Sequence, residues 1–600
     1  MNNYGDKTRA EIPAEYKWNI EAMYPDESKI ETDLETALQH ADELAEMQGH
    51  IMDSSSSLLK MLKIYSTTIR LVEKVFVYSH MRHDEDNGDS KYTEMYGKAV
   101  SVYTDISATL SFVTPEILES SLELVHQYID EQPELEIYRF MLEEIMLQKE
   151  HTLSKDQEYI MASLSEIVGC PDEIFTVLND ADLHFGMVRD EKGIEKPLTH
   201  ASYIQFMESE NREVRKDAYY AMYTKYKELN NTISTLYNFN VKADTVRSKL
   251  RKYNSTIERA LSSENIPTSV YSNLIDAVHE HFPAMHKYVE IRKRILGIDE
   301  LKMYDIYRPL VKPIDKKYTF EEAVNIACEA LSPLGEDYVN TLRNGLLIEK
   351  WVDIYENKGK TSGAYSFGSF DSYPYILMNF TGDLRDVFTL IHEGGHSMHS
   401  YYTRKTQPYI YADHSIFTAE VASTVNETLL IKYLLEHCED QEEKKYLINF
   451  YIDEFKSTLF RQTMFAEFEK IVHEQVEQGE SLSAESMNST YNELNSKYFG
   501  PALSEDDMIQ YEWSRIPHFY RSFYVYQYAT GYSAANAIAN RILTEGEAAV
   551  NDYLKFLTTG SSDYPIELLK IAGVDMSQKD PVLSALDTFD SLVDELAKLL

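Results

Sequence analysis

The stretch DVFTLIHEGGHSMH, residues 386–399, is the most informative part of the chain. It contains the pattern HExxH, with His392, Glu393 and His396 in that order. On a helix, residues four apart lie on one face, so the two imidazoles can share one tetrahedral Zn²⁺ ion. Zinc lowers the pKa of a bound water toward ~7, and the adjacent Glu393 carboxylate can take the proton when that water attacks a carbonyl. The pattern therefore predicts a metal-dependent hydrolytic site.

The residues around this motif support a helix. A random HExxH is expected about 0.05 times in a chain of this composition, so the context has to confirm it. Asp383 followed by Asp386 is typical of a helix N-cap with an acidic first turn. The pair Gly394 and Gly395 is unusual, because each glycine inside a helix costs about 1 kcal/mol against alanine. We expect another backbone or a substrate to pass close to that face.

A catalytic zinc site needs a third protein ligand, and the next helix supplies a candidate. That helix is predicted to begin near Ser415, and Glu420 lies in its first turns, 24 residues after His396. We expect two antiparallel helices with their ligands facing each other. Glu427 lies two turns further on the same face and could hold a ligand imidazole by a hydrogen bond. Taken alone, Glu420 would be read as a solvated carboxylate at a helix start.

Composition excludes several classes of protein. The 600 residues include 58 basic and 99 acidic side chains, a net charge of −41 that disfavours binding to nucleic acid or to an anionic membrane. Three isolated cysteines, without a CxxC pair, argue against a disulfide framework and for a reducing compartment. The N-terminus has no apolar signal region, and no apolar run reaches the length of a membrane span. The sequence predicts a cytoplasmic protein and no particular oligomeric state.

The chain is predicted to be mainly helical, because only 22 glycines and 17 prolines interrupt 600 residues. Apolar stripes at helical spacing cover residues 31–50, 58–78 and 582–600. Two stretches lack this helical pattern. Residues 183–199 resemble a β-hairpin with Gly193 in the turn, and residues 362–381 predict two short strands around a turn near 371–372. We expect an N-terminal helical region (1–115), a helical subdomain that ends in the hairpin (116–200), and a catalytic domain (201–600).

Several motifs together resemble the oligoendopeptidase F branch of the thimet-oligopeptidase-like zinc metallopeptidases. The similarity is carried by HEGGHSMHSYY and FTAEVASTVNE around the motif, and by MYDIYRPL (303–310), SGAYS, YILMNFTG, PHFYRSFYVYQYATGYSAAN (517–536) and YPIELLKIAGVDM (564–576). It covers most of the chain from about residue 200, and more weakly the part before it. The resemblance implies a two-lobed helical fold, with a deep substrate channel and the zinc on its floor.

The resemblance also implies roles for individual residues. His392, His396 and Glu420 would bind one zinc ion per chain, and Glu393 would be the general base. The strand region that contains Gly363, Ala364, Tyr365 and Ser366 would lie along the channel and pair with the substrate backbone. In this scheme the substrates are short peptides, since a narrow opening excludes folded proteins.

The tyrosines after Pro517 allow two interpretations. Tyr520, Tyr524, Tyr528 and Tyr532 recur every four residues, and in a chain with 45 tyrosines such a stripe is as often plain packing as function. The resemblance implies that His518, Tyr524 and Tyr528 donate hydrogen bonds to the oxyanion of the tetrahedral intermediate.

His399 lies one turn after His396 and could approach the substrate, but a structural or supporting role near the metal is favoured.

The predicted function is a zinc-dependent endopeptidase that hydrolyses internal bonds of short oligopeptides. An exopeptidase of the same fold, trimming one or two residues from a peptide end, is the first alternative. A non-catalytic acidic scaffold that binds cationic peptides is the second.

Overall fold

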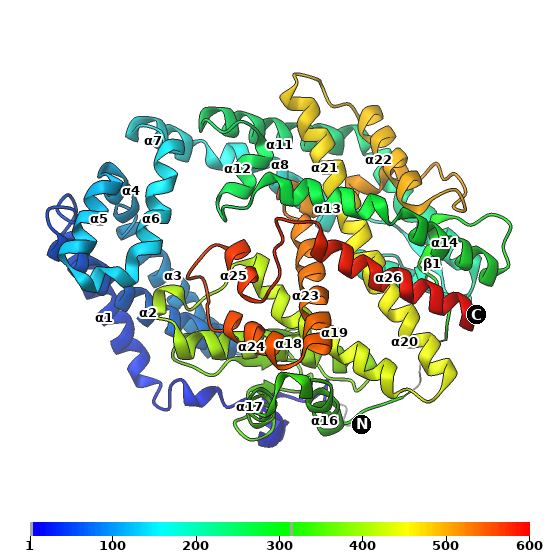
Figure 1. The fold of residues 1–600 in the computed structure, drawn as a ribbon, viewed down its shortest axis with the longest axis horizontal. Helices are drawn as coiled ribbons and strands as arrows, with labels where there is room; N and C mark the ends of the chain where they lie inside the picture. The colour runs from blue at the N-terminus through cyan, green and yellow to red at the C-terminus, as the bar shows by residue number, and fades with distance from the viewer. Residues whose placement is uncertain (1–3, 313–315) are drawn as a thin grey trace. The chain divides into compact units, whose positions relative to one another are not determined.

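The computed structural model describes residues 4–312 and 316–600 (Figure 1). Helices make up 71% of the chain, and the described residues contain five strands of two or three residues each. The predicted fold, mainly helical with a few short strands, is therefore confirmed. The scarcity of glycine and proline explains why so few helices are interrupted.

The chain divides into two compact units, each assembled from three separate segments. The first comprises Met1–Glu150, Asp315–Tyr433 and Ile538–Gly573, and the second comprises His151–Ile314, Leu434–Ala537 and Val574–Leu600. Two units agree with the two lobes that the resemblance implies. The three contiguous regions expected from the sequence (1–115, 116–200 and 201–600) stay a prediction.

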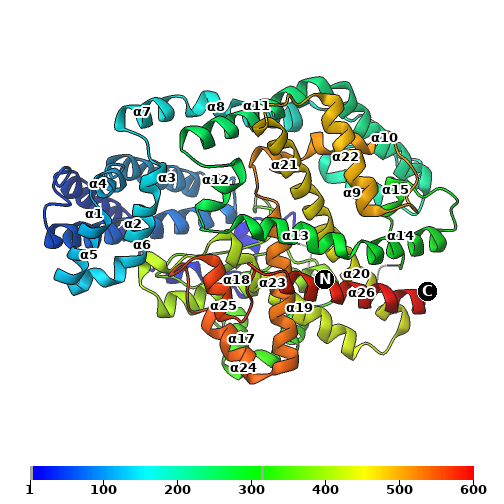
Figure 2. The ribbon, with the colours of Figure 1, turned by 45° about the horizontal axis from the view of Figure 1, so that its top comes forward.

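The first unit has an N-terminal helical layer with a continuous apolar core. Helices α1 to α6 lie together in both views of the ribbon (Figure 1, Figure 2). The predicted stripes at 31–50 and 58–78 fall on α1 and α2, and their buried side chains belong to this core. The helices of this unit are α1 (Ser28–Ala45), α2 (Ser55–Glu85), α3 (Ser90–Thr109), α4 (Val113–Glu119), α5 (Leu122–Glu131), α6 (Arg139–Leu147), α16 (Phe320–Ala330), α17 (Glu336–Leu347), α18 (Leu384–Thr406), α24 (Glu547–Phe556) and α25 (Pro565–Ile571).

A three-stranded sheet connects this core to helix α18. β5 (Tyr375–Leu377) is central, paired in parallel with β3 (Val352–Asp353) and antiparallel with β4 (Tyr365–Phe367). The two strands predicted on either side of residues 371–372 are thus confirmed, while β3 was not predicted because two residues show no periodicity. Tyr375 and Leu377 are buried in the core of α1 to α6, so β5 anchors the sheet and β4 forms its edge.

The second unit contains the predicted hairpin. β1 (Met187–Arg189) pairs antiparallel with β2 (Glu195–Pro197), and Gly193 in the turn has a φ of +75°, which glycine adopts without a steric penalty. Helix α10 packs against both α9 and α15. The helices of this unit are α7 (Lys155–Ser163), α8 (Ser165–Val177), α9 (His200–Met207), α10 (Arg212–Glu228), α11 (Asn230–Leu250), α12 (Thr256–Ser262), α13 (Thr268–Glu280), α14 (Phe282–Leu296), α15 (Met303–Ile306), α20 (Gln441–Glu454), α21 (Arg461–Glu477), α22 (Ala484–Phe499) and α26 (Asp580–Leu599).

Two long helices run from one unit into the other, α19 (Ile416–His437) and α23 (Tyr526–Glu545). The predicted helix near Ser415 corresponds to α19, and the predicted C-terminal helix corresponds to α26.

Candidate active site

The HExxH helix α18 begins as the sequence predicts. The Asp383 side chain accepts the N–H of Asp386 at 3.0 Å, which is an N-cap. The Asp386 carboxylate reaches back and accepts the backbone N–H groups of Thr381 and Gly382 at 2.7 and 2.6 Å. The first bond satisfies an N–H group of the first helical turn, and the other two tie the preceding residues to it, which fixes the start of α18 eight residues before its first histidine.

One of the two glycines of the motif, Gly395, allows α19 to approach α18. A Cβ atom at Gly395 would lie 2.6 Å from the Cα of Ser423, whereas one at Gly394 would lie 3.3 Å from a methyl group of Leu342. The predicted close approach is therefore confirmed for Gly395, and the approaching backbone is that of α19. The fully buried Asn426 adds a tie between the helices, because its side chain donates to the Ile391 carbonyl at 3.3 Å.

The contact between these helices brings the three predicted ligands together. The Nε2 atoms of His392 and His396 each lie 3.6 Å from Oε2 of Glu420. This distance exceeds a hydrogen bond and leaves space for an ion about 2 Å from each donor. Two imidazoles and one carboxylate are a donor set typical of catalytic zinc sites, so the residues fit such an ion.

Glu427 orients one of the imidazoles. Its Oε1 lies 3.2 Å from Nδ1 of His392, on the opposite side of the ring from Glu420. Burial lowers the pKa of His392, but the hydrogen bond to Glu427 and the nearby carboxylate charges outweigh burial and raise it to about 9. A carboxylate on the far nitrogen of a ligand histidine fixes the ring orientation and makes the nitrogen that faces the metal more basic.

Glu393 is buried beside the ligands and is tied to strand β4. Burial raises its pKa to about 7, opposed by the charge of His392 and by a hydrogen bond from the Ser366 backbone. The Ser366 hydroxyl also lies 2.8 Å from the hydroxyl of Ser397 on α18. The edge strand thus positions the predicted general base.

The predicted substrate-binding segment lies at the start of β4. The carbonyl of Gly363 accepts a hydrogen bond from the Asn379 side chain at 2.8 Å, and Gly363 has a φ of +84°. The Tyr365 hydroxyl donates to Asp84 of α2 at 2.8 Å. Gly363 and Tyr365 are therefore held in place, and the edge of β4 that faces away from β5 pairs with no other described strand.

His399 is buried on α18, one turn after His396. Its ring stacks on His414 with the centroids 3.8 Å apart and packs against Phe556. Neither of its nitrogens has a hydrogen-bond partner in the described chain. Burial, together with the charges of His414 and His396, holds the pKa of His399 well below its usual range.

In the second unit, the predicted oxyanion donors form one aromatic cluster. Nε2 of His518 lies 3.4 Å from the hydroxyl of Tyr528, the His518 and Tyr524 rings are nearly parallel, and the Tyr524 and Tyr528 rings meet edge to face. Burial and the charge of Arg521 lower the pKa of His518, which favours a neutral ring. His518, Tyr524 and Tyr528 together form the donor cluster.

The tyrosine stripe divides into two kinds of residue. Tyr520 stacks on Phe175 and Tyr532 packs against Phe455, as expected for plain packing. Tyr524 and Tyr528 are half-buried beside the exposed His518. Tyr520 and Tyr532 therefore fit the packing interpretation, while the functional interpretation of Tyr524 and Tyr528 stays a prediction.

Asn426, Ser397 and the contacts that Ser366 makes with Ser397 and Glu393 were not predicted from the sequence. Asn426 carries a weak signal, as an amide inside an apolar helix. Ser366 and Ser397 carry none, since their contact joins a strand to a helix 31 residues away.

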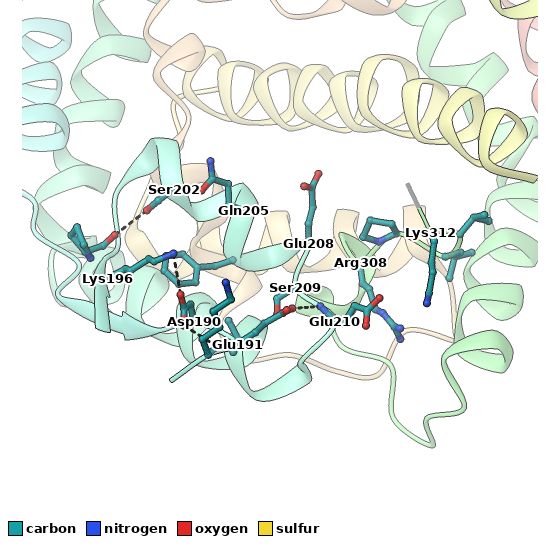
Figure 3. A pocket seen from close by; sticks show the side chains of 17 residues that line it. Asp190, Glu191, Lys196, Ser202, Gln205, Glu208, Ser209, Glu210, Arg308 and Lys312 are labelled. Carbon is teal, nitrogen blue, oxygen red and sulfur yellow. Dashed lines mark hydrogen bonds and ion pairs between the residues drawn. The ribbon is translucent and has the colours of Figure 1, made fainter. Parts of the chain in front are cut away.

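Two other features of the second unit contain none of the predicted site residues. A cavity of about 760 Å³ lies between the hairpin and residues 308–312 (Figure 3). On its rim, Lys196 pairs with Asp190 at 3.0 Å, and Glu191 accepts the N–H of Glu210 at 2.7 Å. A second His–carboxylate group comprises His281, Asp587 and Asp590.

The mainly helical fold, with HExxH on one helix and a glutamate facing it from the next, defines a metallopeptidase. Comparisons with known proteins agree. The sequence pattern of peptidase family M3 matches residues 205–588, and that of the oligopeptidase F N-terminal region matches residues 116–185. The chain therefore belongs to peptidase family M3, in its oligoendopeptidase F branch, and the resemblance seen in the sequence is confirmed.

Individual relatives match over nearly the whole chain. Oligopeptidase PepF of Bacillus subtilis is 44% identical over 592 residues, which cover 99% of this chain and 88% of the relative. The crystal structure of oligoendopeptidase-F from Enterococcus faecium is 37% identical with a TM-score of 0.74, and the match covers 96% of this chain and 99% of the other. A crystal structure from Chlamydophila abortus is 38% identical, with a TM-score of 0.93 and complete coverage of both chains.

No helix among the described residues is both long and apolar enough to cross a membrane.

Proposed function

We propose that this metallopeptidase is a zinc-dependent endopeptidase that cleaves internal bonds of short oligopeptides. The observation that carries the proposal is the convergence of His392 and His396 on one oxygen of Glu420, with the Glu393 carboxylate beside them. Relatives that match almost the whole chain are named oligopeptidases and oligoendopeptidases, which supports internal cleavage of short peptides over trimming from an end.

The chemistry of the three predicted ligands favours zinc. Two imidazoles and a carboxylate suit a borderline-soft divalent ion, and three protein ligands leave a position free for chemistry. When bound, such an ion supplies Lewis acidity that lowers the pKa of a water toward ~7 and polarises a carbonyl. Glu427 would keep the His392 ring turned toward the ion.

Glu393 is the proposed general base. Its carboxylate would take a proton from the attacking water and then pass that proton to the leaving amine, and burial, which raises its pKa, favours the uptake. The hydrogen bond from the Ser366 backbone holds the carboxylate in place during both transfers. The reaction needs no covalent intermediate.

The donor cluster and the edge strand are proposed to handle the substrate. His518, Tyr524 and Tyr528 would donate hydrogen bonds to the oxyanion as it forms, an interaction stronger in the transition state than in the ground state. Residues 363–365 would pair with the peptide backbone, because β4 is the edge of its sheet.

The test is hydrolysis of an internally quenched peptide of about eight to ten residues, blocked at both ends. We expect cleavage at an internal bond, loss of activity with a chelator, and recovery when zinc is added back. Trimming of a free-ended peptide without cleavage of the blocked one would replace the proposal with an exopeptidase. Inactivity on both peptides, with no bound metal, would leave a binding scaffold.

The variant Glu393→Gln separates catalysis from metal binding. We expect zinc content to stay near one per chain while turnover falls by about 10²–10⁴-fold, the usual contribution of general base catalysis. Glu436→Gln is the matched control, since Glu436 is exposed on α19. Near-normal turnover in Glu393→Gln would exclude Glu393 as the base.

A further inference from the structure

The segment that carries the donor cluster contains a strained residue. Phe523 lies between the turn at Pro517–Tyr520 and helix α23, with a φ of +59°. A bulky side chain in this left-handed region is an outlier that persists only where the surroundings impose it. Tyr524 follows directly, so the backbone angle at Phe523 sets the direction in which Tyr524 leaves the segment.

A buried glutamate holds this conformation. The backbone N–H of Phe523 donates to Oε1 of Glu469 on α21 at 2.9 Å. Glu469 is 0% exposed, and the Phe523 side chain is 4% exposed, packed against His473 and Tyr271. The N–H and the ring of the strained residue are therefore both fixed inside the second unit.

The preceding residue is anchored in the same way. The Ser522 hydroxyl donates to Oδ2 of Asp244 on α11 at 2.5 Å. Asp244 is itself held by Arg259, whose Nη2 lies 2.8 Å from Oδ1. Two consecutive residues of the segment are thus bound by acidic side chains from two different helices.

Packing alone does not account for a glutamate at position 469. Its second oxygen, Oε2, has no hydrogen-bond partner in the described chain, and burial raises the pKa of the group well above its usual range. A buried carboxyl with one partner is costly, and an apolar side chain would fill the same volume more favourably. The one contact that a leucine could not make is the hydrogen bond that Glu469 accepts from the Phe523 N–H.

We propose that Glu469 is a positioning residue of this peptidase, which holds Phe523 in its left-handed conformation and thereby orients Tyr524 and Tyr528 toward His518. The inference rests on the proposed role of the donor cluster. Without the acceptor, Phe523 relaxes to a negative φ and the three rings lose their mutual arrangement. Glu469 acts only through the segment, because it touches none of the three rings in the described contacts.

The test compares Glu469→Leu, which removes the acceptor, with Glu469→Gln, which keeps it. We expect the leucine variant to lose kcat by about 10–100-fold, the effect of misplacing a catalytic group by about 1 Å. Its KM should stay within about twofold, its zinc content should not change, and amides 519–527 should exchange with deuterium faster. The glutamine variant should retain most of kcat. Glu474→Leu, an exposed site on α21, is the control.

If the leucine variant does not fold, Glu469→Asp replaces it, because the shortened side chain no longer reaches the Phe523 N–H. Unchanged kcat and exchange in the variants without the acceptor would overturn the proposal, as would a glutamine variant as defective as leucine. Tyr528→Phe is measured alongside. If amides 519–527 exchange faster in Glu469→Leu while kcat is unchanged in Tyr528→Phe, Glu469 is supported as the anchor of the segment. The role of Tyr528 as an oxyanion donor is then rejected instead.

Discussion

The predicted metal ligands His392, His396 and Glu420, here the metal group, and the donor cluster are supported by different kinds of backbone. His392, His396 and Glu420 stand on two long, regular helices, whose backbones meet at Gly395. The donor cluster stands on a short turn, an irregular segment and the first turn of α23. Its conformation depends on a left-handed Phe523 and on buried acids from other helices.

The difference fits the roles proposed for the two groups. Metal ligands need a fixed mutual geometry, and helices joined by close backbone contact provide it with little strain. Oxyanion donors have to meet a charge that exists only during the reaction, and a segment with its own anchors can be aimed independently of the helices. A change in the metal group should therefore remove the metal, whereas a change in the donor cluster should reduce only turnover.

The strongest test of the metal group is Glu420→Gln. An amide is a much weaker ligand than a carboxylate, so zinc binding and peptide hydrolysis should be lost together, with activity falling at least about 10³-fold. Metal analysis and a turnover assay on the same sample check this, with Glu436→Gln on the same helix as the control. Full zinc content with full activity would remove Glu420 from the ligand set.

Glu427→Gln tests the support of the metal group. The amide can still face Nδ1 of His392 but without the charge, so zinc affinity should fall by about 10–100-fold. Competition with a chelator of known affinity measures it. At saturating zinc, turnover should recover most of its value, and failure to recover would place Glu427 in the reaction itself.

Tyr528→Phe tests the donor cluster. Loss of one oxyanion donor should lower kcat by about 10–10³-fold with little change in KM and none in zinc content. Tyr520→Phe is the matched comparison, because the Tyr520 hydroxyl is buried without a partner in the described chain and its removal should leave kcat unchanged. Equal effects of the two variants would assign the whole stripe to packing.

The smallest effect on activity is expected at the glycine pair of the motif, of which Gly395 lets the helices meet. Gly395→Ala places a methyl group 2.6 Å from the Ser423 Cα and should destabilise the fold by about 1–3 kcal/mol. Gly394→Ala meets only a flexible Leu342 methyl at 3.3 Å and should be neutral, or stabilising by up to about 1 kcal/mol. Thermal unfolding of both variants measures the difference. Equal Tm values would mean that the close approach of α19 does not depend on Gly395.

Much of the fold was predictable because its signals are local. The stripes of α1, α2 and α26, the N-cap at Asp383 and the turn at Gly193 each depend on residues within a few positions of one another. Strand β3 was not predictable, because two residues carry no period and its partner β5 lies more than 20 residues away. The division of the chain into two interleaved units also has no local signal, since each unit joins three distant segments.

By itself, the sequence determined that this is a mainly helical metallopeptidase of the oligoendopeptidase F type, with His392, Glu393, His396 and Glu420 as its candidate centre. Helical spacing and residue chemistry are local properties, so they can be read along the chain. Only the tertiary structure decided which neighbours position the site. The Ser366 backbone donates to Glu393, the α19 backbone packs against Gly395, and Glu469 accepts the Phe523 N–H. Those contacts join residues that are distant along the chain, and packing alone brings them together.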